Sequence, residues 1–104
     1  MLLLDDEDEL AETPSANEVA FASALTPEQV AAIDERLLRQ SATEQRKVAR
    51  VVSDALDDGD FDAWDDGCLE FHARRVIALA DAGRLEAFGN LRNPRWSEVR
   101  LPIR

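Results

Sequence analysis

Residues 67–101 read GCLEFHARRVIALADAGRLEAFGNLRNPRWSEVRL, and this stretch decides the fold. Its first half repeats apolar residues at helical spacing, which predicts an amphipathic helix over residues 67–82. Gly83 is expected to end the helix, because glycine tolerates the left-handed conformation of a C-terminal cap. Apolar and polar residues then alternate over 84–88 and 97–102, which predicts two antiparallel strands around a polar turn.

The predicted helix has one apolar face and one face of mixed character. The apolar face, expected to be buried, comprises Leu69, His72, Ala73, Val76, Ile77, Leu79 and Ala80. The other face, expected to be exposed, comprises Glu70, Phe71, Arg74, Arg75, Ala78 and Asp81. An exposed aromatic between arginines is typical of a protein interface. The same face lacks the Asn, Gln, Lys and Ser side chains that read the edges of DNA bases.

Two further helices are predicted earlier in the chain. TPEQ at 26–29 combines a capping box with proline at the first helical position and predicts a helix over 27–40. SATE at 41–44 is a second capping box and predicts a helix over 43–57. Three helices followed by a hairpin predict a mainly α protein with a small β hairpin, arranged as a three-helix winged-helix-like domain. Such a fold serves nucleic-acid binding and protein binding alike.

The N-terminal residues differ in character from the rest. Residues 1–16 are rich in acids and lack a sustained apolar period, which predicts an acidic flexible tail before a domain spanning residues 17–104. The alternative is a docking motif, in which leucines beside the acids bind a basic partner or the basic C-terminal third of this chain. Residues 17–25 fit either a capped helical turn or an alternating strand, and we expect a short ordered segment packed on the domain.

Composition limits the function classes. The 104 residues carry a net charge of -10 and 45% hydrophobic residues, which indicates one small acidic globular domain. Residues 67–104 hold 4 acids and 7 bases, a local balance of +3. The acidic total opposes nucleic-acid binding, because counterion release from phosphates is its main driving force. The single cysteine, Cys68, cannot form an internal disulfide, which favours a reducing cytoplasm, and no run is long enough to span a bilayer.

The sequence offers one candidate metal site and argues against it. In the loop DDGDFDAWDDG at 57–67, Asp58, Asp60 and Asp62 match three ligand positions of an EF-hand. Ala63 and Leu69 occupy the positions that need glycine and a bidentate glutamate. We therefore expect no metal and no cofactor. The chain also lacks phosphate-loop, nucleophile-elbow and zinc-protease motifs, so we expect that it is not an enzyme.

Four motifs resemble those of a bacterial domain family described only as a domain of unknown function. They are LTPEQ at 25–29, RKVARVV at 46–52, ARRVIALADAGRLEA at 73–87 and SEVRLP at 97–102. In that family the domain often follows a larger uncharacterised domain, and here we expect the short acidic tail in its place. The third motif is also similar to the helix-to-wing junction of winged-helix regulators. The resemblance implies a winged-helix-like C-terminal module, but no activity, substrate or site residue.

These observations predict a non-catalytic protein-interaction or regulatory module of the bacterial cytoplasm. We expect its partner to be another protein or a second copy in a homodimer, and not a membrane. The predicted contact residues are Phe61, Trp64, Phe71, Arg74, Arg75, Ala78 and Trp96. The alternative is a DNA-binding transcriptional regulator that uses the third helix and the basic wing. Its contact residues would be Arg74, Arg75, Arg92, Arg95 and Arg100.

Overall fold

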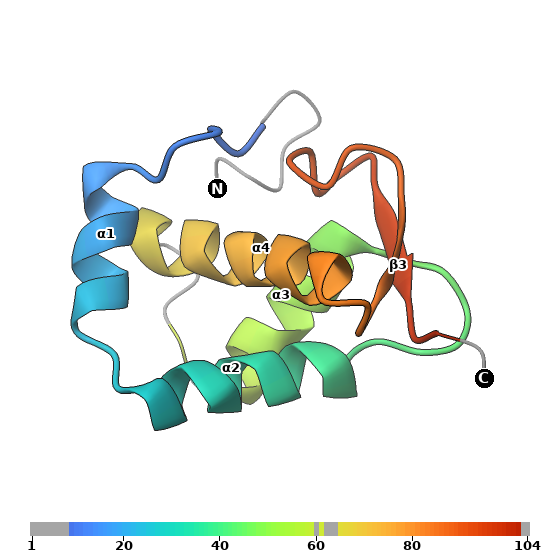
Figure 1. Cartoon of the computed structure of the whole chain (residues 1–104), viewed down its shortest axis with the longest axis horizontal. Coiled ribbons are helices and arrows are strands. Elements are labelled where there is room, and N and C mark those ends of the chain that lie inside the picture. The colour runs from blue at the N-terminus through green and yellow to red at the C-terminus, as the bar shows by residue number, and fades with distance from the viewer. Residues whose placement is uncertain (1–8, 60, 62–64, 103–104) are drawn as a thin grey trace.

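The computed structural model describes residues 9–59, 61 and 65–102. These residues form a mainly helical protein with a small antiparallel sheet, as the sequence predicts (Figure 1). In chain order the elements are α1 (Ala16–Ser23), α2 (Pro27–Arg39), β1 (Arg46–Lys47), α3 (Val48–Asp58), α4 (Asp66–Asp81), β2 (Glu86–Phe88) and β3 (Glu98–Arg100). Helix α4 runs through the middle of Figure 1, with α1 at its N-terminal end and the sheet at the opposite end.

Helix α2 begins where its capping box predicts. The backbone N–H of Gln29 donates to the hydroxyl of Thr26 at 3.2 Å, and the backbone N–H of Thr26 donates to the side-chain oxygen of Gln29 at 2.8 Å. The box satisfies amide groups that the first helical turn leaves without intrahelical partners. The predicted helices over 27–40 and 67–82 are therefore confirmed to within one residue at each end.

The helix predicted over 43–57 begins later than expected. The hydroxyl of Ser41 does not cap it but donates to the carbonyl of Leu37 at 2.9 Å, at the end of α2. Residues 46 and 47 instead form β1, which pairs antiparallel with β3. Helix α3 follows directly at Val48, whose N–H donates to the carbonyl of Ser97 at 3.0 Å. Pairing with a distant strand thus replaces the first helical turn that the capping box predicts.

The predicted hairpin is present as part of a larger sheet. Strands β2 and β3 pair antiparallel, and the strand order is β1-β3-β2. Ser97 and Val99 are fully buried against the helices. Trp96, Glu98 and Arg100 alternate with them and are more exposed, so they mark the outer face of the sheet.

Helix α4 packs against α1, α2 and α3, so more than one of its faces is covered. The predicted apolar face is confirmed at Leu69, Ala73, Val76 and Leu79, which are buried. The expectation that Phe71 is exposed is wrong, because only 8% of this residue is accessible. Helix α1 covers it, and the ring centroid of Phe21 lies 5.7 Å from that of Phe71.

Helix α1 approaches α4 most closely at Gly67. A β-carbon added at Gly67 would lie 2.4 Å from the carbonyl oxygen of Asn17, well inside van der Waals contact. Any other residue at this position would therefore push α1 away. The short ordered segment expected over 17–25 is thus mostly a helix, α1. It can lie against the first turn of α4 because Gly67 has no side chain there.

We predict that Gly67→Ala destabilises the protein by about 1–3 kcal/mol, the usual cost of overpacking. Helix propensity alone predicts the opposite sign, because alanine favours an exposed helix by about 1 kcal/mol over glycine. Urea denaturation followed by circular dichroism measures the difference. An increase in stability would show that α1 does not contact Gly67 as described.

Candidate functional site

An N-terminal arm, residues 9–23, lies along the body of the protein. Leu10 is buried with 1% accessibility, and its N–H donates to the carbonyl of Arg92. The carboxylate of Glu9 pairs with the Arg92 guanidinium at 2.8 Å. Residues 9–16, expected in a flexible tail, therefore contact the C-terminal third, as in the docking alternative. Residues 1–8 of that tail lie outside the described residues.

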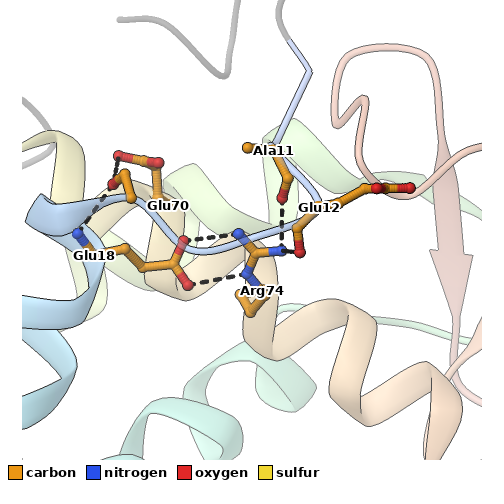
Figure 2. Close-up of polar contacts among 6 residues, drawn as sticks. Ala11, Glu12, Glu18, Glu70 and Arg74 are labelled. Carbon is orange, nitrogen blue, oxygen red and sulfur yellow. Dashed lines mark hydrogen bonds and ion pairs between the residues drawn. The ribbon is translucent and has the colours of Figure 1, made fainter.

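One arginine of α4, Arg74, bonds to the arm at several points. Arg74 donates two hydrogen bonds of 2.9 Å to the two carboxylate oxygens of Glu18 (Figure 2). A third nitrogen donates to the carbonyls of Ala11 at 2.8 Å and Glu12 at 3.3 Å. The Glu18 side chain is only 4% exposed, so removing Arg74 would leave a buried carboxylate without its ion-pair partner. Hydrogen bonding to Glu18 outweighs desolvation and raises the pKa of Arg74.

A second polar contact joins the start of α1 to α4. Ser15 caps α1 by accepting a hydrogen bond from the N–H of Glu18 at 3.1 Å. The same hydroxyl donates to the Glu70 carboxylate at 3.2 Å. Burial raises the pKa of Glu70, and the nearby charges of Glu18 and Asp66 add to this effect. Ser15 therefore caps the N-terminus of α1 and also contacts α4.

The second arginine of α4 joins it to α2. Arg75 donates two hydrogen bonds of 2.8 Å to the two carboxylate oxygens of Asp34. Hydrogen bonding to Asp34 raises the pKa of Arg75. Ala78, on the same side of α4, is partly buried. The mixed face of α4, predicted to be exposed, is therefore largely occupied by α1 and α2, and its two arginines pair there with Glu18 and Asp34.

The arginines of the hairpin differ in their surroundings. Arg92 pairs with Glu9 of the arm, and Arg100 pairs with Glu86 of β2 at 2.8 Å. Arg95 is exposed at the surface of the loop between β2 and β3. Of the arginines that the DNA-binding alternative needs, Arg74, Arg75, Arg92 and Arg100 therefore each pair with a carboxylate of their own chain.

Trp96 lies next to Arg95 and is 61% exposed, more than any other large hydrophobic residue in the described ranges. The ammonium nitrogen of Lys47, on the neighbouring strand β1, lies 5.3 Å from the centre of its ring. This distance is within range of a cation–π interaction. The sequence predicted Trp96 as a contact residue but missed Lys47, because residue 47 was expected inside a helix.

The other predicted contact residues do not join Trp96 on one surface. Phe61 packs inward, with its ring centroid 6.1 Å from Phe21 and 5.1 Å from His72. Phe71 is buried beneath α1, as described above. Trp64 lies outside the described residues. Of the described members of the predicted contact set, Trp96 therefore lies on the outer face of the sheet, whereas the others lie on α4 or pack inward.

The residues best suited to chemistry, His72 and Cys68, are both buried in the core. The Nδ1 atom of His72 lies 2.8 Å from the backbone carbonyl of Cys68, so Nδ1 carries the proton and donates. The Nε2 atom is buried and has no hydrogen-bond partner among the described residues. Burial lowers the pKa of His72, so the ring is neutral at physiological pH. These features are those of a packed histidine.

The described residues contain no group of three or more His, Cys, Asp or Glu side chains placed to hold a metal ion. The loop over 57–67 falls partly outside them, at residues 60 and 62–64. Asp65 caps α4 by accepting from the N–H of Cys68 at 3.2 Å. The acids at this end of the loop therefore stabilise the start of a helix.

Comparisons with protein-family models, curated proteins and solved structures found no match to this chain. The resemblance to a domain family of unknown function therefore stays a prediction. Within the described part of the chain, no helix has the length and apolar character needed to cross a bilayer. The geometry of the arm, of α4 and of the outer sheet face is thus the basis for a functional proposal.

We predict a coupling energy of about 1–3 kcal/mol between Arg74 and Glu18 in a double-mutant cycle, because the pair is bidentate and mostly buried. The variants are Arg74→Met, Glu18→Gln and the double variant, compared by urea denaturation. The matched control is the exposed pair Arg39 and Asp58, for which we expect less than about 0.5 kcal/mol. Equal coupling in both pairs would contradict the structural role of Arg74.

We predict that the stability of the protein decreases as pH falls below about 6.5, the ordinary pKa of histidine. Burial lowers the pKa of folded His72, so the unfolded state binds the extra proton first and gains free energy. Urea midpoints between pH 8 and pH 5 should fall less in His72→Leu than in the unchanged protein. Glu70 titrates in both proteins, so the difference isolates His72. Parallel curves would contradict the assignment.

Proposed function

We propose that this protein is a non-catalytic protein-interaction module with a winged-helix-like fold. The order α2, β1, α3, α4, β2 and β3 supports this fold, with α1 added in front. The strand order β1-β3-β2 also supports it. Strand β1, which lies between α2 and α3 in the chain, pairs with β3, the second strand of the hairpin. The motifs that resemble the bacterial domain family agree with the proposal, and we propose that the protein acts in the cytoplasm.

The observation that carries the proposal is the exposure of Trp96 on the outer face of the sheet. An indole ring 61% exposed leaves a large apolar area in water, and tryptophan is enriched where partners bind. A second aromatic, Phe88, lies on the same face, with the Arg100 guanidinium carbon 5.2 Å from its ring centre. Aromatic rings beside cations on an exposed sheet face support a protein-binding surface.

The nucleic-acid alternative receives less support. A duplex bound by α4 would have to replace Glu18 on Arg74 and Asp34 on Arg75, two bidentate partners. It would also have to replace Glu9 on Arg92 in the hairpin. The net charge of -10 adds long-range repulsion from phosphates. We therefore propose that the module recognises a protein, either a second copy or another chain, and acts by binding alone.

We predict that Trp96→Ala removes partner binding without unfolding the protein. Affinity capture from the cells of origin, with the unchanged protein and the variant, measures the loss. The matched control is Val19→Ala, which shortens the other large exposed hydrophobic residue, 52% exposed on α1. Its capture should equal that of the unchanged protein, and circular dichroism should show that both variants are folded.

The same proteins test the DNA-binding alternative by fluorescence anisotropy with labelled duplexes at physiological salt. We expect weak binding that does not depend on sequence. Sub-micromolar, sequence-selective binding that is lost in an Arg92→Glu, Arg95→Glu variant would contradict the proposal. Full partner capture by Trp96→Ala would also contradict it.

A further inference from the structure

The N-terminal arm has two parts, which are held to the body by different atoms. The Nε and Nη2 atoms of Arg74 donate to Glu18 of α1. The Nη1 atom of the same side chain donates instead to two backbone carbonyls of residues 9–12, which precede the helix. A further bond joins the N–H of Leu10 to the carbonyl of Arg92. Residues 9–12, which we name the Leu10 segment, can therefore leave the body while α1 keeps its own bonds.

The Leu10 segment contacts the body as a bound peptide does. Leu10 is 1% accessible and joins the hydrophobic core, whereas Glu9, Ala11 and Glu12 beside it are exposed. The carbonyls of Ala11 and Glu12 point towards Arg74 in Figure 2, and the carboxylate of Glu12 points away from it. In known modes of peptide recognition, main-chain bonds of this kind give affinity and a pocket for a side chain gives specificity.

The acid that precedes the leucine has partners of its own on the hairpin. The carboxylate of Glu9 lies 2.8 Å from the Arg92 guanidinium and accepts a hydrogen bond from the Asn90 amide at 3.3 Å. A carboxylate oxygen of Glu12 lies 4.0 Å from the same guanidinium. Among the described residues, both carboxylates that pair with Arg92 thus belong to the Leu10 segment. The chemistry that the body recognises here is an acid followed by a leucine.

We propose that Arg74, Asn90 and Arg92, together with the apolar space that Leu10 fills, form a peptide-binding site that the chain itself occupies. A partner protein that carries an acidic residue followed by a leucine displaces the Leu10 segment and makes the same contacts. We name this place the Leu10 site. The inference goes beyond the proposed function, because it does not involve Trp96 or the outer face of the sheet.

The contacts of the Leu10 segment are few enough to exchange. The side chains of Arg92 and Glu9 are 36% and 46% exposed, and ion pairs at such positions contribute little to stability. The burial of one leucine side chain is the main apolar contribution. Segments with few buried contacts open more often than the whole protein unfolds. The segment still excludes weak ligands, because its short tether gives it an effective concentration on the order of millimolar.

The test is fluorescence anisotropy with a labelled ten-residue peptide that has the sequence of residues 5–14. The protein is the full chain, either unchanged or with Leu10→Asp, which places a charge where the leucine is buried. We expect the peptide to bind Leu10→Asp about tenfold more tightly than the unchanged chain, whose own segment competes with it. A peptide with alanine in place of its leucine should bind neither protein.

Two further substitutions in the Leu10→Asp chain locate the binding. Arg92→Glu should weaken peptide binding about tenfold, because it reverses the charge that pairs with the acid before the leucine. Arg39→Glu is the matched control, since it makes the same change at another exposed arginine with a carboxylate partner, and it should have no effect. If circular dichroism shows that Leu10→Asp disturbs the fold, Glu9→Lys replaces it. That variant weakens the chain's own segment at an exposed position and should also bind the peptide more tightly than the unchanged chain.

Several outcomes would overturn the inference. Equal peptide binding by the unchanged chain and the variant would show that the Leu10 segment does not compete, and no binding by either would show that there is no such site. Binding that Arg92→Glu leaves unchanged would place the peptide elsewhere. A dimer in sedimentation that Leu10→Asp abolishes would show that the segment binds a second copy. None of these outcomes bears on the capture experiment with Trp96→Ala, so the proposed function is tested separately.

Discussion

The guanidinium of Arg74 holds the N-terminal arm to the rest of the protein. It donates to both carboxylate oxygens of Glu18 and to two backbone carbonyls of the arm. A carboxylate as buried as that of Glu18 is costly without a charged partner. The packing of α1 and the burial of Phe71 beneath it therefore depend on this contact, whereas Leu10 and Glu9 bond to Arg92. Gly67 permits the same arrangement by leaving room for the backbone of Asn17.

This arrangement makes α4 a core helix. Arg74 binds the arm on one side, and Arg75 binds Asp34 of α2 on another. The face that a winged helix would offer to DNA is thus used for internal contacts. The sheet lies at the end of α4 opposite α1 in Figure 1, and Trp96 on its outer face is exposed to water. Binding is therefore proposed at the outer face of the sheet, whereas α4 packs inside the protein.

Local patterns predicted much of the fold, and distant contacts account for what they missed. Helices α2 and α4 follow from periodicity and caps within their own sequences. Strand β1 is only two residues long and exists because β3, about fifty residues later, pairs with it. The capping pattern at residues 41–44 has the same form as that at 26–29, yet Ser41 bonds backward to α2. Sequence alone does not show that Thr26 caps the helix after it whereas Ser41 bonds to the helix before it.

In the candidate site, too, local patterns predicted some features and distant contacts account for the others. Helical spacing identified the two faces of α4, but the burial of Phe71 depends on a helix fifty residues earlier in the chain. A capped helical turn was one of the two alternatives for residues 17–25, whereas the bond of Glu18 to Arg74 crosses 56 positions. Trp96 was predicted as a contact residue and is exposed. Lys47 was missed because its place beside Trp96 follows from the strand pairing.

The central claim is that α1 covers the outer side of α4. Nuclear Overhauser spectroscopy on the full chain tests it most directly, because the ring centroids of Phe21 and Phe71 lie 5.7 Å apart. The structure predicts cross-peaks between these rings and protection of Phe71 from a soluble paramagnetic probe. Absence of the cross-peaks, with Phe71 signals broadened by the probe as strongly as those of Trp96, would contradict it.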